Sequence, residues 1–305
     1  MFVAGNCYLR IKRDEDMKKI LVTGASGFVG RAFTARWQYE YKLLTPSHSE
    51  LDITDAASVD AYMMAHTPDV VLHLAALSNT WYCEQHPDES FLVNVTGSEN
   101  VARAAARYGA KFVFFSSDQV YNGNSEQGPL SEDVPVRPVS HYARHKLEAE
   151  QRIAEISLAA VMLRATWMYD APQLAAPHAD FVNNMLNAVK EGNVLTLPVR
   201  EYRGITWVRD VVNNLPLAFS LQGGVYNFGS GNNVNTYETA CCFYEMLYGS
   251  DASRIVTPDY ERYAPACRNL SMDTDKIFRA SGGGICFPST IDGLRLFVEM
   301  VPVKG

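Results

Sequence analysis

The chain has 305 residues, of which 47% are hydrophobic, and its 27 basic and 34 acidic residues give a net charge of −7. This length and composition suit a soluble enzyme that buries a large core in one compound domain or two lobes. The acidic balance and the absence of a Lys/Arg cluster argue against binding to nucleic acid. No apolar run approaches the roughly 18 residues that a membrane span needs.

The start of the chain and the cysteines are typical of a cytoplasmic protein. Residues 1–16 lack the apolar core of a signal peptide. Because the first predicted strand follows Met17 closely, we expect residues 1–16 to be a disordered extension before the true start. The cysteines show no metal-binding or paired spacing, so we expect reduced, mostly packed thiols, no disulfides and no metal site; they are Cys7, Cys83, Cys241, Cys242, Cys267 and Cys286.

A strand predicted over 20–23 runs directly into three glycines at three-residue spacing, Gly24, Gly27 and Gly30, followed by a helix predicted over 28–39. Gly24 allows a tight turn, Gly27 lets the backbone approach a pyrophosphate, and Gly30 lets the helix pack closely on the strand. The helix N-terminus then faces the phosphates. This strand, turn and helix form the context that a dinucleotide-binding fingerprint requires.

Apolar runs then alternate with helical segments, which indicates a doubly wound parallel sheet. We predict further strands over 42–45, 70–74, 112–116 and 160–164, and further helices over 56–67, 89–108 and 142–156. Right-handed crossovers place the carboxyl ends of these strands along one edge of the sheet. The glycine turn and the residues that follow each strand should therefore meet at one cleft.

Tyr142 and Lys146 lie four residues apart at the start of the helix predicted over 142–156. This spacing places a phenol and an ammonium on one helical face. The ammonium should favour the phenolate and lower the pKa of Tyr142, so that the phenol passes a proton near neutral pH. Taken alone, the pair also fits an ordinary exposed helix. The glycine fingerprint upstream makes the catalytic interpretation preferable.

Together these motifs resemble the extended short-chain dehydrogenase/reductase superfamily, from about residue 18 almost to the C-terminus. Within it the chain is similar to the dTDP-4-dehydrorhamnose reductase family, which has the regulatory β subunit of methionine adenosyltransferase as a relative. The segments that carry the resemblance are Asp52-Ile53, 73–76, 83–87, 94–97, 116–121, Tyr142 with Lys146, and 268–273.

The resemblance implies an α/β fold, a Rossmann-type doubly wound parallel sheet with a smaller C-terminal substrate-binding lobe. Residues 17–168 and 203–230 would form the NAD(P)-binding domain, and residues 169–202 and 231–305 the lobe. The implied ligands are a nucleotide sugar and a dinucleotide, and the implied location is the cytoplasm. The resemblance is also compatible with a homodimer.

The resemblance also implies cofactor contacts from the glycine turn, the ends of the second to fourth strands and the catalytic helix. These residues are Gly24, Ser26, Gly27, Phe28, Val29, Gly30, Arg31, Asp52, Ile53, Leu74, Ala75, Ala76, Asn94, Ser116, Tyr142 and Lys146. The alternative for Asp52 is that it caps the helix that follows. The alternative for Asn94 is that it is an ordinary helix residue.

The cofactor preference depends on the residues after the second predicted strand. They read Thr45-Pro46-Ser47-His48, with no acid to hold a ribose 2′-hydroxyl or repel a 2′-phosphate. We therefore expect NADP(H), with Arg31, Ser47 and His48 as candidate phosphate partners and NAD(H) as the alternative.

The resemblance implies a catalytic set of Ser117, Tyr142 and Lys146. Tyr142 would protonate the substrate oxygen, Ser117 would hydrogen-bond the same oxygen, and Lys146 would also bind the nicotinamide ribose. Ser117 is preferred over Ser116 because it lies three residues before Val120, the spacing that the family uses.

The resemblance also implies substrate contacts from Arg203 and Arg268, whose planar guanidinium groups suit the diphosphate of a nucleotide sugar. Both also fit solvated surface arginines. Trp167 is a candidate for the pocket wall, with core packing as the alternative, and Asp118 is a candidate next to the substrate.

Three functions fit these residues: a reductase of a nucleotide-linked 4-keto-6-deoxysugar, a nucleotide-sugar epimerase or dehydratase, and an NADP-binding regulatory subunit without catalysis. Dehydratases of the superfamily generally carry Asp-Glu after the catalytic hydroxyl, whereas this chain has Asp118-Gln119. Trp81 and Ala266-Cys267 also depart from the reductase pattern, so the sugar stays open.

Overall fold

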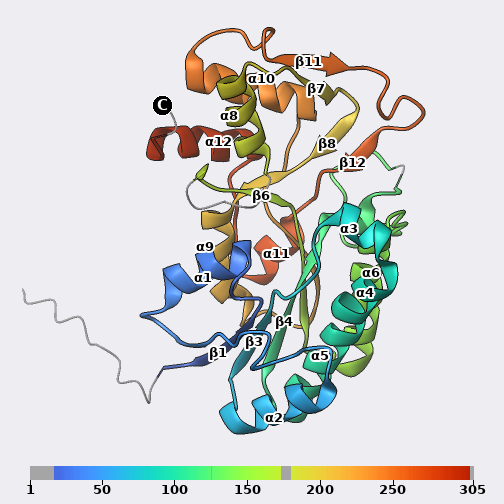
Figure 1. The fold of residues 1–305 in the computed structure, drawn as a ribbon, viewed down its shortest axis with the longest axis vertical. Coiled ribbons are helices and arrows are strands. Elements are labelled where there is room, and N and C mark those ends of the chain that lie inside the picture. Colours follow the sequence, from blue (N-terminus) through green and yellow to red (C-terminus); the bar gives the residue numbers. More distant parts are fainter. Residues whose placement is uncertain (1–16, 125, 173–179, 303–305) are drawn as a thin grey trace, which may run out of the picture.

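The computed structural model describes residues 17–124, 126–172 and 180–302, and its centre is a parallel sheet of six strands (Figure 1). The strand order is β10-β5-β4-β3-β1-β2, which confirms the predicted α/β fold with a Rossmann-like sheet. The strands are β1 (Lys19–Thr23), β2 (Lys42–Leu44), β3 (Val70–His73), β4 (Lys111–Ser117), β5 (Val161–Ala165) and β10 (Gly224–Phe228). All their pairings are parallel.

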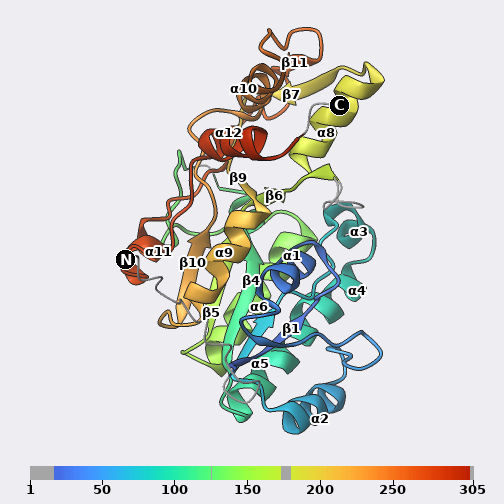
Figure 2. The same ribbon diagram turned by 90° about the vertical axis from the view of Figure 1, so that its left-hand side faces the viewer.

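Helices cover both faces of this sheet (Figures 1 and 2). One face carries α2 (Ala56–His66), α5 (Ser98–Arg107) and α6 (His141–Ile156), and the other carries α1 (Phe28–Trp37) and α9 (Val208–Ala218). The alternation of side chains along β1 explains the two cores. Ile20 and Val22 lie in the core shared with α1 and α9, whereas Leu21 lies in the core shared with α2 and α5.

The helix predicted over 89–108 is a succession of three segments. These are α4 (Pro87–Phe91), a π-helical segment η2 (Leu92–Gly97) and α5. A short helix before them, α3 (Thr80–Gln85), was not predicted from the sequence. A π-helical stretch inside a helix often occurs at a functional site, and here it holds Asn94 and Gly97.

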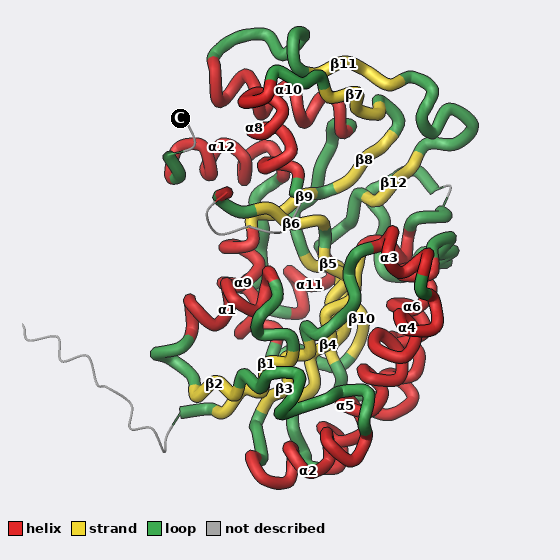
Figure 3. Tube along the Cα trace, in the orientation of Figure 1, coloured by secondary structure: helices red, strands yellow, loops and turns green. Residues whose placement is uncertain are grey.

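The second half of the chain adds a smaller part beyond the carboxyl ends of the main strands, with three two-stranded parallel sheets (Figure 3). The sheets pair β6 with β9, β7 with β11, and β8 with β12. The strands are β6 (Trp167–Tyr169), β7 (Leu195–Pro198), β8 (Glu201–Arg203), β9 (Ile205–Trp207), β11 (Val256–Asp259) and β12 (Arg268–Leu270). Its helices are α8 (Phe181–Glu191), α10 (Thr236–Tyr248) and α12 (Thr290–Met300). Helix α11 (Asp275–Ala280) instead packs against β10 of the main sheet, and a 3-10 turn η3 (Asp118–Tyr121) follows β4.

The domain boundaries proposed from the sequence stay predictions, and the expected extension over 1–16 lies outside the described residues. No helix in the described ranges has the length and apolar character needed to cross a bilayer. Among the cysteines that the structure describes, Cys83 is buried but Cys267 and Cys286 are exposed, so the thiols are less uniformly packed than predicted.

Candidate active site and nucleotide pocket

The glycine turn between β1 and α1 is shaped by close backbone contacts. Gly24 has a φ of +70°, and a Cβ there would lie 2.7 Å from the Ala75 nitrogen. A Cβ at Gly30 would lie 2.3 Å from the Gly24 carbonyl oxygen. The fold therefore needs glycine at both positions, because a side chain would strain the turn or separate it from the loop after β3.

Gly27 differs from these two glycines. It is exposed, and a Cβ there would meet only the Gly24 carbonyl oxygen, at 3.2 Å. Gly27 is also the N-cap of α1, whose end has no side-chain cap and no acidic residue in its first turn. A helix N-terminus without a side-chain cap favours a negatively charged ligand. These residues fit the pyrophosphate of a dinucleotide.

The other predicted contacts around the turn differ in exposure. Ser26 and Arg31 are exposed, and Phe28 is half-buried. Val29 is buried in the core between the sheet and α1. Its side chain therefore supports the turn from below, and a contact with a cofactor would come from its backbone.

Asp52 and Ile53 lie beyond β2, near the start of α5. The Asp52 carboxylate accepts hydrogen bonds from the Thr54 hydroxyl at 2.7 Å and the Thr54 amide at 2.9 Å, and these bonds lower its pKa. The cap of α2 is Asp55, not Asp52, so the capping alternative for Asp52 was wrong. Ile53 packs against Gly97, where a Cβ would come within 2.9 Å of its side chain.

A hydrogen-bonded chain through a buried histidine fixes the loop after β3, and sequence reasoning missed its role. The Ala75 amide donates to the Thr23 hydroxyl at 3.3 Å, which lies 2.7 Å from His73 Nδ1. On the other side, His73 Nε2 lies 3.0 Å from the Ser98 hydroxyl, which donates to the Asn94 carbonyl at 2.7 Å. Since Ser98 has one hydrogen to give, His73 must donate from Nε2 and accept at Nδ1.

Burial lowers the pKa of His73 to about 3, and the Lys146 ammonium adds to the decrease. The imidazole is therefore neutral at physiological pH, as the one-way hydrogen-bond chain requires. The His73-Leu74-Ala75-Ala76 segment already marked this strand end in the sequence. The hydrogen-bond partners of His73, Thr23 and Ser98, lie far from it in the sequence, so no local sequence pattern indicated these contacts.

Asn94 holds the same loop from the π-helical segment. Its side-chain oxygen accepts from the Leu77 amide at 2.8 Å, and its amide group donates to the Leu77 carbonyl at 2.9 Å. Asn94 is fully buried. Its side chain therefore positions the loop that follows Leu74, Ala75 and Ala76, and direct contact with a cofactor stays a prediction.

Ser117, Tyr142 and Lys146 come together at the carboxyl end of β4. Ser117 is the last residue of β4, and Tyr142 and Lys146 lie in the first two turns of α6. The Ser117 side chain is near enough to lower the pKa of the Tyr142 phenol, against the larger effect of burial. Lys146 Nζ donates to the Phe115 carbonyl at 2.8 Å and lies 6.0 Å from the centre of the Tyr142 ring. The structure thus brings together the three residues predicted from the sequence, and their catalytic roles stay predictions.

The electrostatics of this group differ from the prediction. Tyr142 is only 8% exposed and Lys146 only 3%. Burial raises the pKa of Tyr142, and the Asp118 carboxylate adds to the increase. Burial also lowers the pKa of Lys146 to about 8. The expected lowering of the Tyr142 pKa by Lys146 was wrong for this structure, because desolvation dominates and the ammonium is bonded to Phe115.

The two serines at the end of β4 face opposite sides of the strand. Ser116 donates to Glu150 at 2.5 Å inside the core, where Glu150 pairs with Arg164. Ser117 instead donates to Asp118 Oδ1 at 3.2 Å. The Ser116 side chain is therefore committed to the core, and a cofactor contact from Ser116 would come from its backbone.

A pocket of about 480 Å³ opens in the smaller part of the molecule. It is lined by three of the predicted substrate residues, Trp167, Arg203 and Arg268. The Arg203 guanidinium lies 4.8 Å from the centre of the Trp167 ring and 3.2 Å from the carboxylate of Asp118. Trp167 thus lies at a pocket wall, and neither arginine is a free surface side chain.

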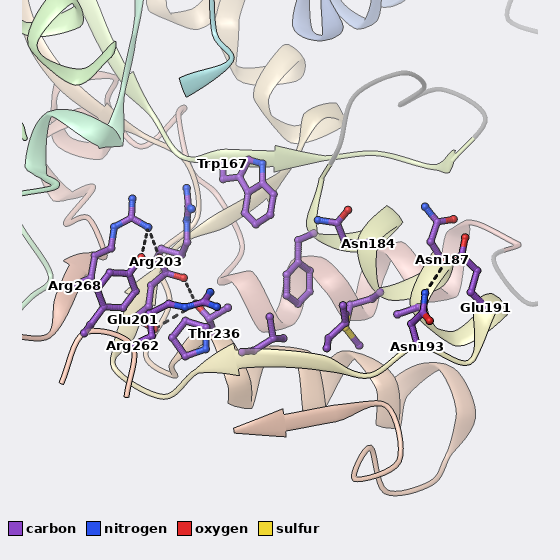
Figure 4. Close-up of a pocket in the computed structure, with 17 residues that line it drawn as sticks. Trp167, Asn184, Asn187, Glu191, Asn193, Glu201, Arg203, Thr236, Arg262 and Arg268 are labelled. Atoms are coloured by element: carbon purple, nitrogen blue, oxygen red, sulfur yellow. Dashed lines mark hydrogen bonds and ion pairs between the residues drawn. The ribbon is translucent and has the colours of Figure 1, made fainter. Parts of the chain in front are cut away.

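The two ends of the pocket have different chemistry (Figure 4). Arg203, Arg268 and Glu201 gather at one end, and an amide-rich group that includes Asn184 and Asn187 lies at the other. Glu201 is buried; burial alone would raise its pKa, but the charges of both arginines and the hydrogen bonds from Thr236 and Arg268 together lower it. Glu201 therefore remains charged and holds the arginine end together.

The Arg268 guanidinium already has several hydrogen-bond partners within the protein, which the sequence did not predict. Its guanidinium bonds Glu201, the Asn122 side-chain oxygen at 2.8 Å and the Gln119 side-chain oxygen at 2.9 Å. Tyr263, another lining residue that sequence reasoning missed, lies beside it with its ring centre 5.6 Å from the guanidinium. No group of three or more metal-ligating side chains occurs within the ranges that the structure describes.

The loop after β2 contains a carboxylate that the prediction overlooked. Glu50 accepts from the Ser47 amide at 2.8 Å and from the Ser47 hydroxyl at 2.7 Å. These bonds, the backbone one foremost, lower the pKa of Glu50, so it is charged at neutral pH. The four residues after β2, Thr45 to His48, include no acidic residue. The turn that follows nevertheless places the carboxylate of Glu50 beside Ser47.

Comparison with known proteins gives a consistent result. A family model described as the RmlD substrate binding domain matches residues 17–287. The spore coat polysaccharide biosynthesis protein SpsK of Bacillus subtilis (strain 168) is 28% identical over 230 residues, covering 75% of this chain and 79% of that protein. The dTDP-4-dehydrorhamnose reductase of Aggregatibacter actinomycetemcomitans is 25% identical over 282 residues, covering 87% and 94%.

A third relative is the methionine adenosyltransferase 2 subunit beta of Bos taurus, 27% identical over 295 residues and covering 90% of this chain and 86% of that protein. Among solved structures, the dTDP-4-dehydrorhamnose reductase of Bacillus anthracis str. Ames in complex with NADP superposes with a TM-score of 0.80. It is 22% identical and covers 93% of this chain and 100% of that one. This likeness shows the shared fold.

Proposed function

The chain belongs to the RmlD substrate binding domain family, and on that premise we propose that it reduces a nucleotide-linked 4-keto-6-deoxysugar with NADPH, as a dTDP-4-dehydrorhamnose reductase does. One observation carries the proposal: Ser117, Tyr142 and Lys146 meet beside an arginine-bearing pocket, and Asp118 links Ser117 to Arg203 of that pocket. Acid catalysis and diphosphate binding are thereby adjacent.

The glycine turn and the start of α1 would hold the cofactor. Gly27 leaves room for the pyrophosphate, and the N-terminus of α1, which has no side-chain cap, would bind it. Bound NADPH would supply the hydride. Leu74, Ala75 and Ala76 follow β3 at the same edge and are held by the His73 and Asn94 hydrogen bonds.

Tyr142 would act as the general acid. Because burial raises its pKa, the phenol is protonated at neutral pH and can donate its proton to the substrate oxygen that becomes a hydroxyl. Ser117 would hydrogen-bond the same oxygen and hold it within reach of Tyr142. Lys146, near the Tyr142 ring, would bind the nicotinamide ribose hydroxyls.

Arg203 and Arg268 would bind the diphosphate of the substrate, since two guanidinium forks match two phosphates. Trp167 would pack against the ligand between the arginine and amide ends of the pocket. This arrangement also argues against a dehydratase. Asp118 is paired with Arg203 at 3.2 Å and is followed by Gln119, so the acid pair that dehydratases carry is missing.

We expect NADPH to bind more tightly than NADH, and Glu50→Gln to widen the difference. The carboxylate of Glu50 occupies the Ser47 amide and hydroxyl, and a 2′-phosphate would need these donors and be repelled by the charge. Fluorescence titration of both cofactors with wild type and Glu50→Gln measures the ratio. The control is Glu40→Gln, because Glu40 is an exposed carboxylate that pairs with Arg36. A loss of NADH affinity in Glu50→Gln would instead assign Glu50 to the ribose hydroxyls and contradict the NADPH preference.

The function is tested by NADPH oxidation with dTDP-4-dehydrorhamnose generated in situ. We expect turnover that is slower with NADH and absent without the sugar nucleotide. Cofactor that co-purifies as tightly bound NAD and is recycled during the reaction would favour an epimerase. NADPH binding without turnover of any 4-keto-6-deoxysugar nucleotide would contradict the reductase.

A second candidate is a regulatory subunit that binds NADP, because methionine adenosyltransferase 2 subunit beta of Bos taurus matches 90% of this chain. Stoichiometric capture of a methionine adenosyltransferase from the native host, combined with no sugar-nucleotide turnover, would favour this candidate.

A further inference from the structure

The side chain of Gln119 connects the turn after β4 to the arginine end of the pocket. Its Oε1 accepts from Arg268 NH2 at 2.9 Å, and its Nε2 donates to Asp118 Oδ1 at 3.2 Å. The Ser117 hydroxyl donates to the same Asp118 oxygen, also at 3.2 Å. Gln119 and Asp118 are both buried. A series of hydrogen bonds therefore runs from Ser117 to Arg268, which lines the pocket.

Resting on the proposed function, we propose that Gln119 is a positioning residue that holds Arg268 of the pocket in register with Ser117. Its carboxamide is needed in one orientation, with the oxygen toward Arg268 and the nitrogen toward Asp118. Neither a carboxylate nor an apolar side chain of the same length supplies both contacts. The diphosphate of a nucleotide sugar bound at Arg268 is thereby placed at a fixed distance from the ketone that Ser117 binds.

The hydrogen-bond partners fix the orientation of the Gln119 carboxamide. A guanidinium has donors only, so the Gln119 atom that faces Arg268 must be the oxygen. The same oxygen accepts from the Asn122 side-chain amide at 3.3 Å, while Asn122 Oδ1 accepts from Arg268 Nε at 2.8 Å. The Gln119 nitrogen then faces the Asp118 carboxylate, which has acceptors only. Glutamine therefore matches a donor on one side and an acceptor on the other.

These contacts decide what Arg268 can offer to a ligand. Its Nε donates to Asn122, and its NH1 donates to Glu201 and, at 3.4 Å, to the Tyr263 hydroxyl. Gln119 takes one hydrogen of NH2, and the other has no protein partner among the described residues. That remaining hydrogen is left for an anion in the pocket. Gln119 is bonded to the same nitrogen, so it helps to set the direction of this donor.

Gln119 also joins the two parts of the molecule. It lies in η3, directly after β4 of the main sheet, whereas Arg268 is the first residue of β12 in the smaller part. In addition, its backbone amide donates to the Ser117 hydroxyl at 3.2 Å. A change in the Gln119 side chain should therefore affect both anion binding at Arg268 and the reaction step beside Ser117.

Three variants separate the contacts of Gln119. Gln119→Met removes both side-chain contacts. Gln119→Glu keeps an acceptor for Arg268 but places a second acceptor against Asp118. Asp118→Asn combined with Gln119→Glu exchanges the amide and the carboxylate, so the amide at position 118 donates to the carboxylate at position 119 and the net charge is that of the wild type. Calorimetric titration of the full-length protein with dTDP measures binding, and NADPH oxidation with dTDP-4-dehydrorhamnose measures kcat.

We expect Gln119→Met and Gln119→Glu each to weaken dTDP binding about tenfold and to lower kcat by a similar factor, because hydrogen bonds to charged groups are lost. NADPH affinity should stay unchanged, whereas a general loss of structure would lower it as well. The exchanged double variant should bind dTDP several-fold more tightly than Gln119→Glu. The matched control is Gln38→Met, since Gln38 is exposed at the end of α1, and it should change none of these quantities.

A double variant that binds dTDP no better than Gln119→Glu would overturn the proposal. So would a loss of NADPH affinity in parallel with dTDP affinity, because the role would then be general stability. A wild type that does not bind dTDP would also overturn it, since Arg268 would have no anion to hold. If Gln119→Met fails to fold, Gln119→Glu and the double variant decide, because they keep the size of the side chain.

Binding and turnover keep this proposal separable from the proposed function. Recovery of dTDP affinity in the double variant, without turnover of any 4-keto-6-deoxysugar nucleotide by the wild type, would retain the role of Gln119 in anion binding and reject the reductase. Turnover by the wild type without that recovery would reject the role of Gln119 alone.

Discussion

Tyr142→Phe should lower kcat for ketone reduction by roughly 10²- to 10⁴-fold, the range attributed to a positioned general acid. The substitution removes the proton donor and leaves the buried ring in place at the start of α6. Because the ring keeps its packing, NADPH affinity and thermal stability should change little. Steady-state NADPH oxidation with dTDP-4-dehydrorhamnose, NADPH titration and a thermal melt measure the three quantities.

Tyr39→Phe is the control for this substitution, because Tyr39 is 86% exposed and lies outside the site. It should leave kcat, affinity and stability unchanged. A Tyr142→Phe protein that keeps most of its activity would show that another group supplies the proton. The role of general acid could then no longer be assigned to Tyr142 of α6.

The sheet and the glycine turn could be predicted because their signals are local or topological. A strand that runs into glycines at fixed spacing needs no knowledge of the rest of the chain. The handedness of crossovers then gathers the carboxyl ends of β1, β3 and β4 at one edge. This rule brought Gly24 next to Ala75, as expected.

The pKa of Tyr142 could not be predicted in sign from the spacing of Tyr142 and Lys146. Spacing gives the distance between two groups on a helix, but the pKa also depends on how much solvent both lose. Here α6 packs into the fold so closely that burial outweighs the ammonium. The same limit applies to Glu50, whose carboxylate returns to Ser47 through a turn.

The pocket was only partly predictable because its lining comes from distant segments. Arg203 lies on β8 and Arg268 on β12, which pair with each other in a small parallel sheet. Tyr263 has a φ of +63° in the loop before β12, a conformation that a residue of its type rarely adopts. Neither that loop nor the placement of Glu201 between the arginines has a sequence signal, since both depend on this pairing.

A buried ion pair connects α6, the helix that carries Tyr142, to the main sheet. Glu150 of α6 and Arg164 of β5 are 3% and 5% exposed, and their closest atoms, Oε2 and NH2, are 2.7 Å apart. Ser116 of β4 donates to Glu150 at 2.5 Å, and Arg164 donates to the Tyr121 hydroxyl at 2.8 Å. This network fixes the helix that carries Tyr142 against the strand that carries Ser117.

Glu150→Gln should therefore lower the free energy of unfolding by about 3–5 kcal/mol, because it leaves the Arg164 guanidinium buried without a counter-charge. Urea denaturation followed by circular dichroism measures the change in midpoint at constant slope. Glu148→Gln is the matched control on the same helix, since Glu148 pairs with Arg152 at 2.8 Å on the half-exposed side. It should cost less than about 1 kcal/mol.

Removing both buried charges separates the two contributions of this pair. The double variant Glu150→Gln, Arg164→Gln should lose less stability than Glu150→Gln alone, since no unpaired charge remains inside the protein. A double variant at least as unstable as the single one would mean that the hydrogen bonds to Ser116 and Tyr121, and not the charge, hold α6 in register. Either result identifies what keeps Tyr142 of α6 aligned with Ser117 of β4.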